Sequence, residues 1–300
     1  GGINYLPDTS FKFKQFSTTE GVPTRNVRSL FIDDYLPVNT TAITDTFKRV
    51  WAACFSDITG STVRNGNAMR GLPSPVTDTL KYFKKILAIT YCQTIAGSKD
   101  EVWVYVSMST PDTNKIIRYR RTDTAYLGAF NITNSPLPQN FNVKAMFYDP
   151  VNKKWWLGMS TGGLYTYTPA GSSWNQINFP TIFPAGTIVN NNAITGDTRG
   201  NIYIGTNKGY VFFGSPNSSV VLNPLDVSQY KLLTMADGLP ANNVKGIAID
   251  YRSSRIVIAT DSGIVFKYLL CQECVNTGPA YSILPGNWVN PGIWAGGKVP

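Results

Sequence analysis

The side chains of this sequence that recur in patterns suited to chemistry are carboxylates, amides, lysines and cysteines. None of the 300 residues is histidine. Without an imidazole, Ser-His-Asp and Cys-His nucleophile systems and His-ligated zinc sites are excluded. The remaining candidates are therefore repeated polar positions, and their spacing decides what they can do.

Aspartates recur at the ends of apolar runs, at Asp33, Asp149, Asp197 and Asp250. Such a ladder suits a calcium ring or paired catalytic carboxylates, but an aspartate after a strand commonly accepts a hydrogen bond from its own backbone two residues on. Glycoside hydrolysis needs two carboxyls roughly 5 to 10 Å apart, and the sequence offers only three glutamates beside these aspartates. We favour turn chemistry and expect no enzyme, no catalytic residue, no metal and no cofactor.

Amides form a second recurring set. An asparagine lies seven residues before each of the four aspartates, and a small residue lies four before it. A fifth copy fits if Cys92 takes the aspartate place, which puts Lys85 at the asparagine position. Amides gathered in this way suit sugar hydroxyls, whereas the alternative is that each asparagine caps its turn. With polar loop residues added, the candidate ligand-binding set is Asn26, Lys85, Asn142, Asn190, Asn243, Asp57, Asn207, Lys208 and Asp261.

The four cysteines, Cys54, Cys92, Cys271 and Cys274, allow three disulfide connectivities. The Cys271-x-x-Cys274 spacing makes these two the candidate disulfide, with two thiols as the alternative, because no second Cys-x-x-Cys completes a metal site. An even cysteine count and sparse charge favour an exported protein.

The elements that must position these residues follow from an internal repeat. Residues Glu20–Asp33 match Asp237–Asp250 without a gap. After each aspartate come a polar turn, a β-rich run, a glycine and further short strands. Four strands per unit predict the blade of a β-propeller. Aromatic residues recur in register in the second strands and are expected between the blades, at Trp51, Trp103, Trp156 and Tyr203.

The predicted fold is all-β, a propeller of five four-stranded blades over residues 11–268. The 258 residues from Phe11 to Tyr268 give about 52 per blade, close to the roughly 40 to 50 of known propeller repeats. The N-terminal strand Phe11–Phe16 is expected to complete the last blade and close the ring, which hides its edges. In the first blade we expect an insertion over residues 34–48 and a third strand after Gly60, and residues 65–84 leave the fourth strand ambiguous.

The repeat resembles the two-component regulator propeller repeat. The resemblance is carried by Asp237–Asp250, by Gly200–Thr206 and by Trp156–Gly158 with Gly162–Leu164. It implies an extracellular module of Bacteroidetes-like proteins, or the periplasmic input region of a hybrid sensor kinase that responds to polysaccharide fragments. Residues 269–300 form a tail, and Gly286–Pro300 resembles the opening of a β-rich module of secreted bacterial proteins; a tail packed on the propeller is the alternative.

The net charge of +9 comes from 27 basic and 18 acidic residues, although only 15% of the chain is charged. Short basic clusters suit an anionic partner such as a uronic polysaccharide or a membrane surface, with a solvated strand face as the default. They lack an aromatic platform, so no nucleic acid is expected. No apolar run reaches 18 residues, so no membrane insertion is expected. The clusters are Lys81, Lys84 and Lys85, and Arg118, Arg120 and Arg121.

We therefore expect a monomeric, non-catalytic ligand- or protein-binding module of a larger bacterial protein that is secreted, periplasmic or on the cell surface. Its expected partner is a polysaccharide fragment or an envelope protein. Two alternatives remain open, a periplasmic sensor input domain of a two-component system and a carbohydrate-active enzyme or lyase.

Overall fold

The computed structural model describes residues 3–5, 14–16, 26–33, 49–55, 57–59, 62–64, 67–73, 80–88, 91–107, 114–161, 163–215, 221–250 and 255–268. Over these residues the chain is all-β apart from three short 3-10 turns. The tail 269–300, with Cys271 and Cys274, and the insertion predicted at 34–48 lie outside the described residues. No helix in the described part is long and apolar enough to cross a membrane.

Five antiparallel sheets follow one another along the chain. The first has the order β3 (Val27–Asp33), β4 (Arg49–Cys54), β7 (Asn67–Pro73) and β8 (Leu80–Ala88). The second runs from β9 (Cys92–Gly97) through β10 (Glu101–Val106) and β11 (Lys115–Arg120) to β12 (Tyr126–Phe130). The third consists of β13 (Val143–Asp149), β14 (Lys154–Met159), β15 (Leu164–Thr168) and β16 (Ser173–Ile177).

The fourth sheet consists of β17 (Val189–Gly196), β18 (Ile202–Thr206), β19 (Gly209–Phe213) and β20 (Tyr230–Leu233). The fifth has three strands, β21 (Val244–Asp250), β22 (Arg255–Thr260) and β23 (Gly263–Tyr268). Two hairpins stand apart, β1 (Ile3–Tyr5) with β2 (Lys14–Phe16), and β5 (Asp57–Thr59) with β6 (Thr62–Arg64).

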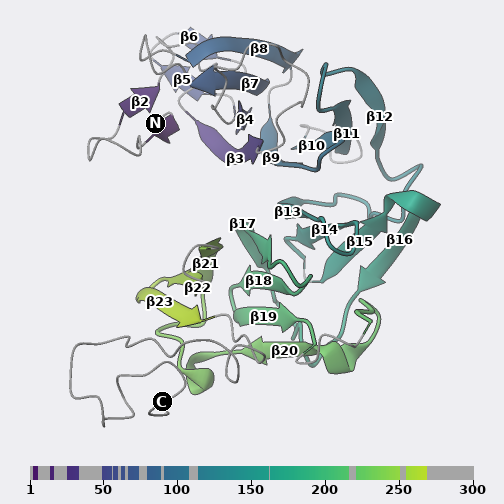
Figure 1. Cartoon of the computed structure of the whole chain (residues 1–300), viewed down its shortest axis with the longest axis vertical. Helices are drawn as coiled ribbons and strands as arrows, with labels where there is room; N and C mark the ends of the chain where they lie inside the picture. Colours follow the sequence, from purple (N-terminus) through teal and green to yellow (C-terminus); the bar gives the residue numbers. More distant parts are fainter. Residues whose placement is uncertain are drawn as a thin grey trace, which may run out of the picture.

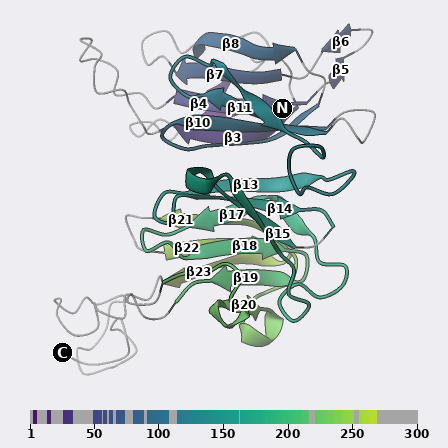
Figure 2. The same ribbon diagram turned by 90° about the vertical axis from the view of Figure 1, so that its right-hand side faces the viewer.

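The first strand of each sheet is its inner strand. The inner strands β3, β9, β13, β17 and β21 contact one another in that order. Figure 1 shows them near the centre of a curve of sheets, and Figure 2 shows the same succession from the side. This arrangement is consistent with a propeller, but the curve is open between the first and fifth sheets.

The core lies between neighbouring sheets. Four clusters of buried apolar side chains join the first sheet to the second, the second to the third, the third to the fourth and the fourth to the fifth. The four aromatic residues predicted between the blades each belong to one of these clusters and are at most 6% exposed, which confirms that expectation: Trp51, Trp103, Trp156 and Tyr203.

Close approach of neighbouring sheets also fixes one glycine. A Cβ added to Gly158 in β14 would clash with Cγ1 of Val189 in β17. The third and fourth sheets therefore meet at a distance that only glycine allows at this position.

The predicted ring closure is wrong for the described strands. Residues Lys14–Phe16 form β2, which pairs with β1 and not with the last sheet. The outer faces of the end sheets stay exposed as a result, at Leu30 and Ile32 on β3 and at Ile264 and Phe266 on β23. These side chains alternate with the ones that pack inward, so each end sheet presents an apolar face that no described sheet covers.

The first sheet also differs from the expectation in its outer strands. The strand after Gly60 is β6, which pairs only with β5 in a small hairpin, and the third strand of the sheet is instead β7, which pairs with β4. The fourth strand, β8, begins near the end of the ambiguous region, at Leu80, and continues to Ala88.

Candidate functional site

One backbone hydrogen bond repeats in all five sheets and defines the end of the molecule where the candidate site lies. The residue that follows the second strand donates its N–H to the carbonyl of the residue just before the inner strand, at 2.8 to 3.2 Å. Both residues therefore lie at the same end of each sheet. The pairs are Phe55 with Asn26, Ser107 with Tyr91, Ser160 with Asn142, Asn207 with Ile188, and Asp261 with Asn243.

In this bond Asn26, Asn142 and Asn243 occupy equivalent positions, whereas Lys85 does not. The structure places Lys85 in β8, opposite Met69 and outside the inner strands. The equivalent residue of the second sheet is Tyr91. The alignment of the second copy was six residues out of register because this copy has neither the asparagine nor the aspartate on which the alignment depended.

Asn190 is also displaced from the repeated position. In β17, Val189 pairs with Thr206 and Ile194 with Ile204, so four residues of β17 lie opposite Gly205 alone. This enlarged bulge adds residues between the start of the strand and Asp197. The seven-residue spacing therefore selects Asn190 by coincidence, and the equivalent residue is Ile188.

The bulge nevertheless brings Asn190 against the next inner strand. Its Nδ2 donates to Oδ1 of Asn243 at 2.9 Å and to the Val244 carbonyl at 2.6 Å. Asn243 in turn donates to Oδ2 of Asp261 at 2.7 Å, and Oδ1 of Asp261 is 3.2 Å from Nζ of Lys245. These amide and carboxyl groups form a polar chain that ties the fourth sheet to the fifth.

The other loop candidates take separate places. Asn207 is held at the end of β18 by accepting from Ile188 N–H at 2.8 Å and donating to the Gly186 carbonyl at 3.0 Å. Lys208 is exposed in the following turn, where its N–H donates to Oγ1 of Thr206. Asp57 lies in the separate hairpin β5-β6, opposite Arg64. The predicted set is therefore brought together only in part.

Two of the four repeated aspartates, Asp149 and Asp197, have described side-chain hydrogen bonds. Both accept from the backbone two residues on, as predicted. Oδ1 of Asp149 accepts from the N–H of Val151 at 2.9 Å, and Oδ1 of Asp197 accepts from the N–H of Arg199 at 2.9 Å. Burial raises the pKa of Asp149, although the hydrogen bonds from Asn152 and Val151 oppose that rise. In the second sheet Ser98 holds the same place and accepts from Asp100 and Glu101.

The side chains of the basic cluster at the end of β11 are held by neighbouring groups. Arg118 makes two hydrogen bonds to the carboxylate of Glu101, at 2.9 and 2.6 Å. Arg120 pairs with Asp123 at 2.8 Å, and Nε of Arg121 donates to the Lys99 carbonyl at 2.7 Å. This cluster is therefore part of the framework rather than an open anion site.

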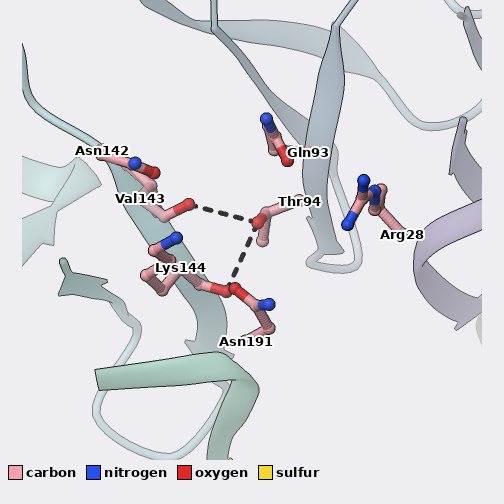
Figure 3. A pocket seen from close by; sticks show the side chains of 7 residues that line it. All are labelled: Arg28, Gln93, Thr94, Asn142, Val143, Lys144 and Asn191. Atoms are coloured by element: carbon pink, nitrogen blue, oxygen red, sulfur yellow. Dashed lines mark hydrogen bonds between the residues drawn. The ribbon is translucent and has the colours of Figure 1, made fainter. Parts of the chain in front are cut away.

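A hollow with a mainly polar lining lies at the end of the molecule marked by the repeated bond, and sequence reasoning missed most of it. It is partly open to solvent and spans about 250 Å³ when that open solvent is included. Figure 3 shows its lining side chains, which come from the inner strands of four sheets or the residue before them. They are Arg28, Gln93, Thr94, Asn142, Val143, Lys144 and Asn191.

Most of these side chains sit at β-bulges. The pairing of inner and second strands skips Arg28 in β3, Gln93 in β9 and Lys144 in β13, and Asn191 lies in the larger bulge of β17. An extra residue in one strand bends the strand and re-aims its side chain. The sequence held one sign of a shared basic position, because Arg28 and Lys245 are aligned with each other in the 14-residue match.

Contacts around the hollow hold its walls together. Oγ1 of Thr94 donates to the carbonyls of Val143 and Lys144, at 3.3 and 3.4 Å, which joins β9 to β13 (Figure 3). On the other side, Nδ2 of Asn192 donates to the Arg28 carbonyl at 2.9 Å and links β17 to β3.

The described cysteines play no part in this site. Cys54 and Cys92 are buried thiols at the interface of the first and second sheets. Burial, together with the neighbouring Cys54, raises the pKa of Cys92 to about 12. Among the residues that the structure describes, no three His, Cys, Asp or Glu side chains cluster as metal ligands would.

Comparison with known proteins places the fold but no family. No family model and no curated protein sequence matches the chain. The extracellular domain of a protein described as a hybrid two component system of B. thetaiotaomicron is similar in structure, with a TM-score of 0.51 and 17% identity over 81% of this chain and 27% of that one. PorZ, a surface component of the type-IX secretion system of Porphyromonas gingivalis, gives a TM-score of 0.52 and 14% identity over 88% of this chain and 35% of PorZ. The chain thus spans about a third of the length of these structures, and the likeness is one of fold.

Proposed function

We propose that this chain is a non-catalytic binding module of a bacterial extracellular or cell-envelope protein, and that it binds its ligand at the hollow where the inner strands begin. The observation that carries the proposal is the lining of that hollow. Side chains from four sheets converge there, and none of the seven lining residues is an acid. Concave sites with a few convergent polar groups are the usual place for a ligand.

Three of the described carboxylates that could have served an enzyme are engaged in the framework of the sheets. Asp149 and Asp197 accept hydrogen bonds within their own turns, and Glu101 is held by Arg118 and Trp103. A glycosidase needs two carboxyl groups that face one substrate bond. These three contacts favour binding over catalysis.

The extracellular setting is supported by the similar structures, one described as an extracellular domain and one as a bacterial surface component. A sensor input domain would be one use of the same binding module. A membrane-spanning segment and a kinase domain in the same gene product would support that use.

A binding screen tests the proposal. The purified chain is titrated on an array of neutral and acidic bacterial and plant oligosaccharides, and any hit is repeated with purified Asn142→Ala and Asn191→Ala variants. We expect saturable binding that both substitutions weaken about 5-fold or more, as expected when a hydrogen bond worth about 1 kcal/mol is lost. Gln176→Ala, an exposed amide on the outer strand β16, is the matched control and should bind normally. Affinity that neither asparagine substitution changes, or no binding of any oligosaccharide, would overturn the proposal.

A further inference from the structure

The bulged position of the inner strands carries a run of cationic and amide side chains. The residues skipped in the pairing are Arg28, Gln93, Lys144 and Lys245, and the bulge of β17 contains Asn190, Asn191 and Asn192. Three of the five inner strands therefore place a basic side chain at this position, and the other two place amides there. No acidic residue occupies the position in any of the five sheets.

The charge is compensated in only one of the three cases. Lys245 in β21 lies 3.2 Å from the carboxylate of Asp261. Within the described part of the chain, neither Arg28 nor Lys144 makes an ion pair, and both line the hollow. Two like charges around a concave surface, without a carboxylate among the lining residues, create a positive potential that attracts anions.

The surroundings hold the cations at the hollow. The guanidinium carbon of Arg28 lies 4.9 Å from the ring centroid of Phe55, within the range of a cation–π contact. Lys144 belongs to β13, whose backbone is fixed to β9 by Thr94. Figure 3 shows Arg28 on one side of Thr94 and Lys144 on the other, with Gln93, Asn142 and Asn191 around them.

The size of the hollow limits what enters it. The space of about 250 Å³ includes open solvent, so the hollow is a shallow recess and not an enclosed pocket. Such a recess can contact one small substituent of a ligand, while the rest of the ligand stays in solvent. The flanking amides both donate and accept hydrogen bonds, which suits the hydroxyls beside a charged group on a sugar ring.

We propose that the hollow binds the anionic substituent of an acidic saccharide, a carboxylate or a sulfate, between Arg28 and Lys144. This inference rests on the proposed binding function and adds the class of ligand. The amides Gln93, Asn142 and Asn191 bind hydroxyls of the same sugar, and Lys245 remains paired with Asp261.

Calorimetric titration of the full chain tests the inference. The probes are trigalacturonate and its methyl ester, which has the same sugars without charge, together with galactose 6-sulfate and galactose as the sulfate pair. We expect one acidic probe to bind at least 10-fold tighter than its neutral partner, and the preferred pair identifies the anion. Because charge attraction at a partly exposed site is screened by ions, the affinity should fall as salt rises from 50 to 500 mM.

Variants locate the binding. Arg28→Gln and Lys144→Gln should each weaken the acidic probe about 5-fold, a factor that corresponds to a partly exposed ion pair. Neither should change the neutral probe. Lys99→Gln and Lys231→Gln remove the same charge from exposed positions away from the hollow and serve as matched controls.

The outcomes separate the two proposals. Equal affinity for acidic and neutral saccharides, still weakened by Asn142→Ala, would overturn the anion site and keep the binding module. Equal loss in the hollow variants and the control variants would show attraction by net charge only and would also overturn the site. An acidic peptide such as tetraglutamate binding better than either saccharide would overturn the saccharide class. No binding of any probe would overturn the inference for this chain.

Discussion

The indole rings of Trp103 in β10 and Trp155 in β14 stack face to face, with ring centroids 4.0 Å apart and planes inclined by 8°. Each ring is almost fully buried. The ring centroids of Phe130, Tyr167 and Trp174 lie 5.3 to 6.5 Å from that of Trp103. The second and third sheets are therefore joined through one aromatic cluster, and its disruption has a measurable cost.

Trp155→Ala is expected to lower the free energy of unfolding by about 4 kcal/mol, because it leaves a large cavity between two sheets. Equilibrium unfolding in urea, followed by circular dichroism, measures the change. Trp103→Ala and the double variant complete a cycle, which should give a coupling of about 1 kcal/mol for the stacked pair. Tyr126→Ala, at a ring that is 65% exposed, is the control. Additive losses in the cycle would contradict direct coupling of the two rings.

Glu101 makes stability depend on pH. Burial acts to raise its pKa, but the hydrogen bonds from Arg118 and Trp103 and the charge of Arg118 outweigh burial and leave the pKa below its usual value of 4.5. A lowered folded-state pKa means that the stabilisation is present above about pH 4.5 and is lost as the pH falls through the folded-state pKa.

Glu101→Gln should therefore destabilise the protein by about 2 kcal/mol at pH 7, the range of hydrogen bonds to charged groups, and by less at pH 3. Urea unfolding at both pH values checks this difference. Asp123→Asn removes an exposed carboxylate paired with Arg120 and should cost much less stability than Glu101→Gln at pH 7. A loss from Glu101→Gln that is the same at both pH values would rule out this account.

Asp149 is expected to stabilise a turn and nothing else. Its carboxylate accepts from the N–H groups of Val151 and Asn152 and from Nδ2 of Asn152, at 2.9, 3.1 and 2.6 Å. Asp149→Ala leaves these donors without an acceptor and should cost about 2 kcal/mol in urea unfolding. Asp149→Asn keeps Oδ1 as an acceptor and should cost less, and Asp100→Ala, at an exposed turn position, should cost little. A shift of the melting temperature by millimolar calcium that Asp149→Ala abolishes would instead indicate a metal site.

The thiols of Cys54 and Cys92 should be inert in the folded protein. Both side chains are fully buried, and the pKa of Cys92 is raised to about 12, so almost no thiolate exists at neutral pH. In a Cys271→Ser/Cys274→Ser background, a disulfide-exchange reagent at pH 8 should label no thiol until denaturant is added, and two thiols afterwards. Rapid labelling of the folded variant would show that the interface of the first two sheets opens readily.

The repeat predicted the sheets and their aromatic interfaces because an aromatic residue in the second strand of a blade has to pack against a neighbour. Trp51, Trp103, Trp156 and Tyr203 were found on that ground. The same alignment failed in the second sheet, where Tyr91 and Ser98 replace the asparagine and aspartate of the other copies. Tyr91 keeps the backbone hydrogen bond of the asparagine, and Ser98 keeps the turn of the aspartate. The second sheet therefore keeps the structure of the repeat although its sequence no longer matches.

The hollow was harder to predict because its side chains depend on bulges. Regular alternation assigns Arg28 and Lys144 to one face of a strand, and the sequence does not mark the residue that the pairing will skip. Ring closure was the other failure. The prediction counted strands and assumed that a missing strand would be supplied by the N-terminal segment, whereas Lys14–Phe16 pairs with β1.

The placement of the core between sheets, rather than within them, has a consequence for how the protein comes apart. Each sheet depends on its neighbours, so stability is transmitted from sheet to sheet along the chain as in a one-dimensional array. The second, third and fourth sheets are each supported from two sides, and the first and fifth from one side among the described residues. Opening should therefore begin at the ends of the array, and amide hydrogens in β21 and β22 should exchange with solvent before those in β13 and β14.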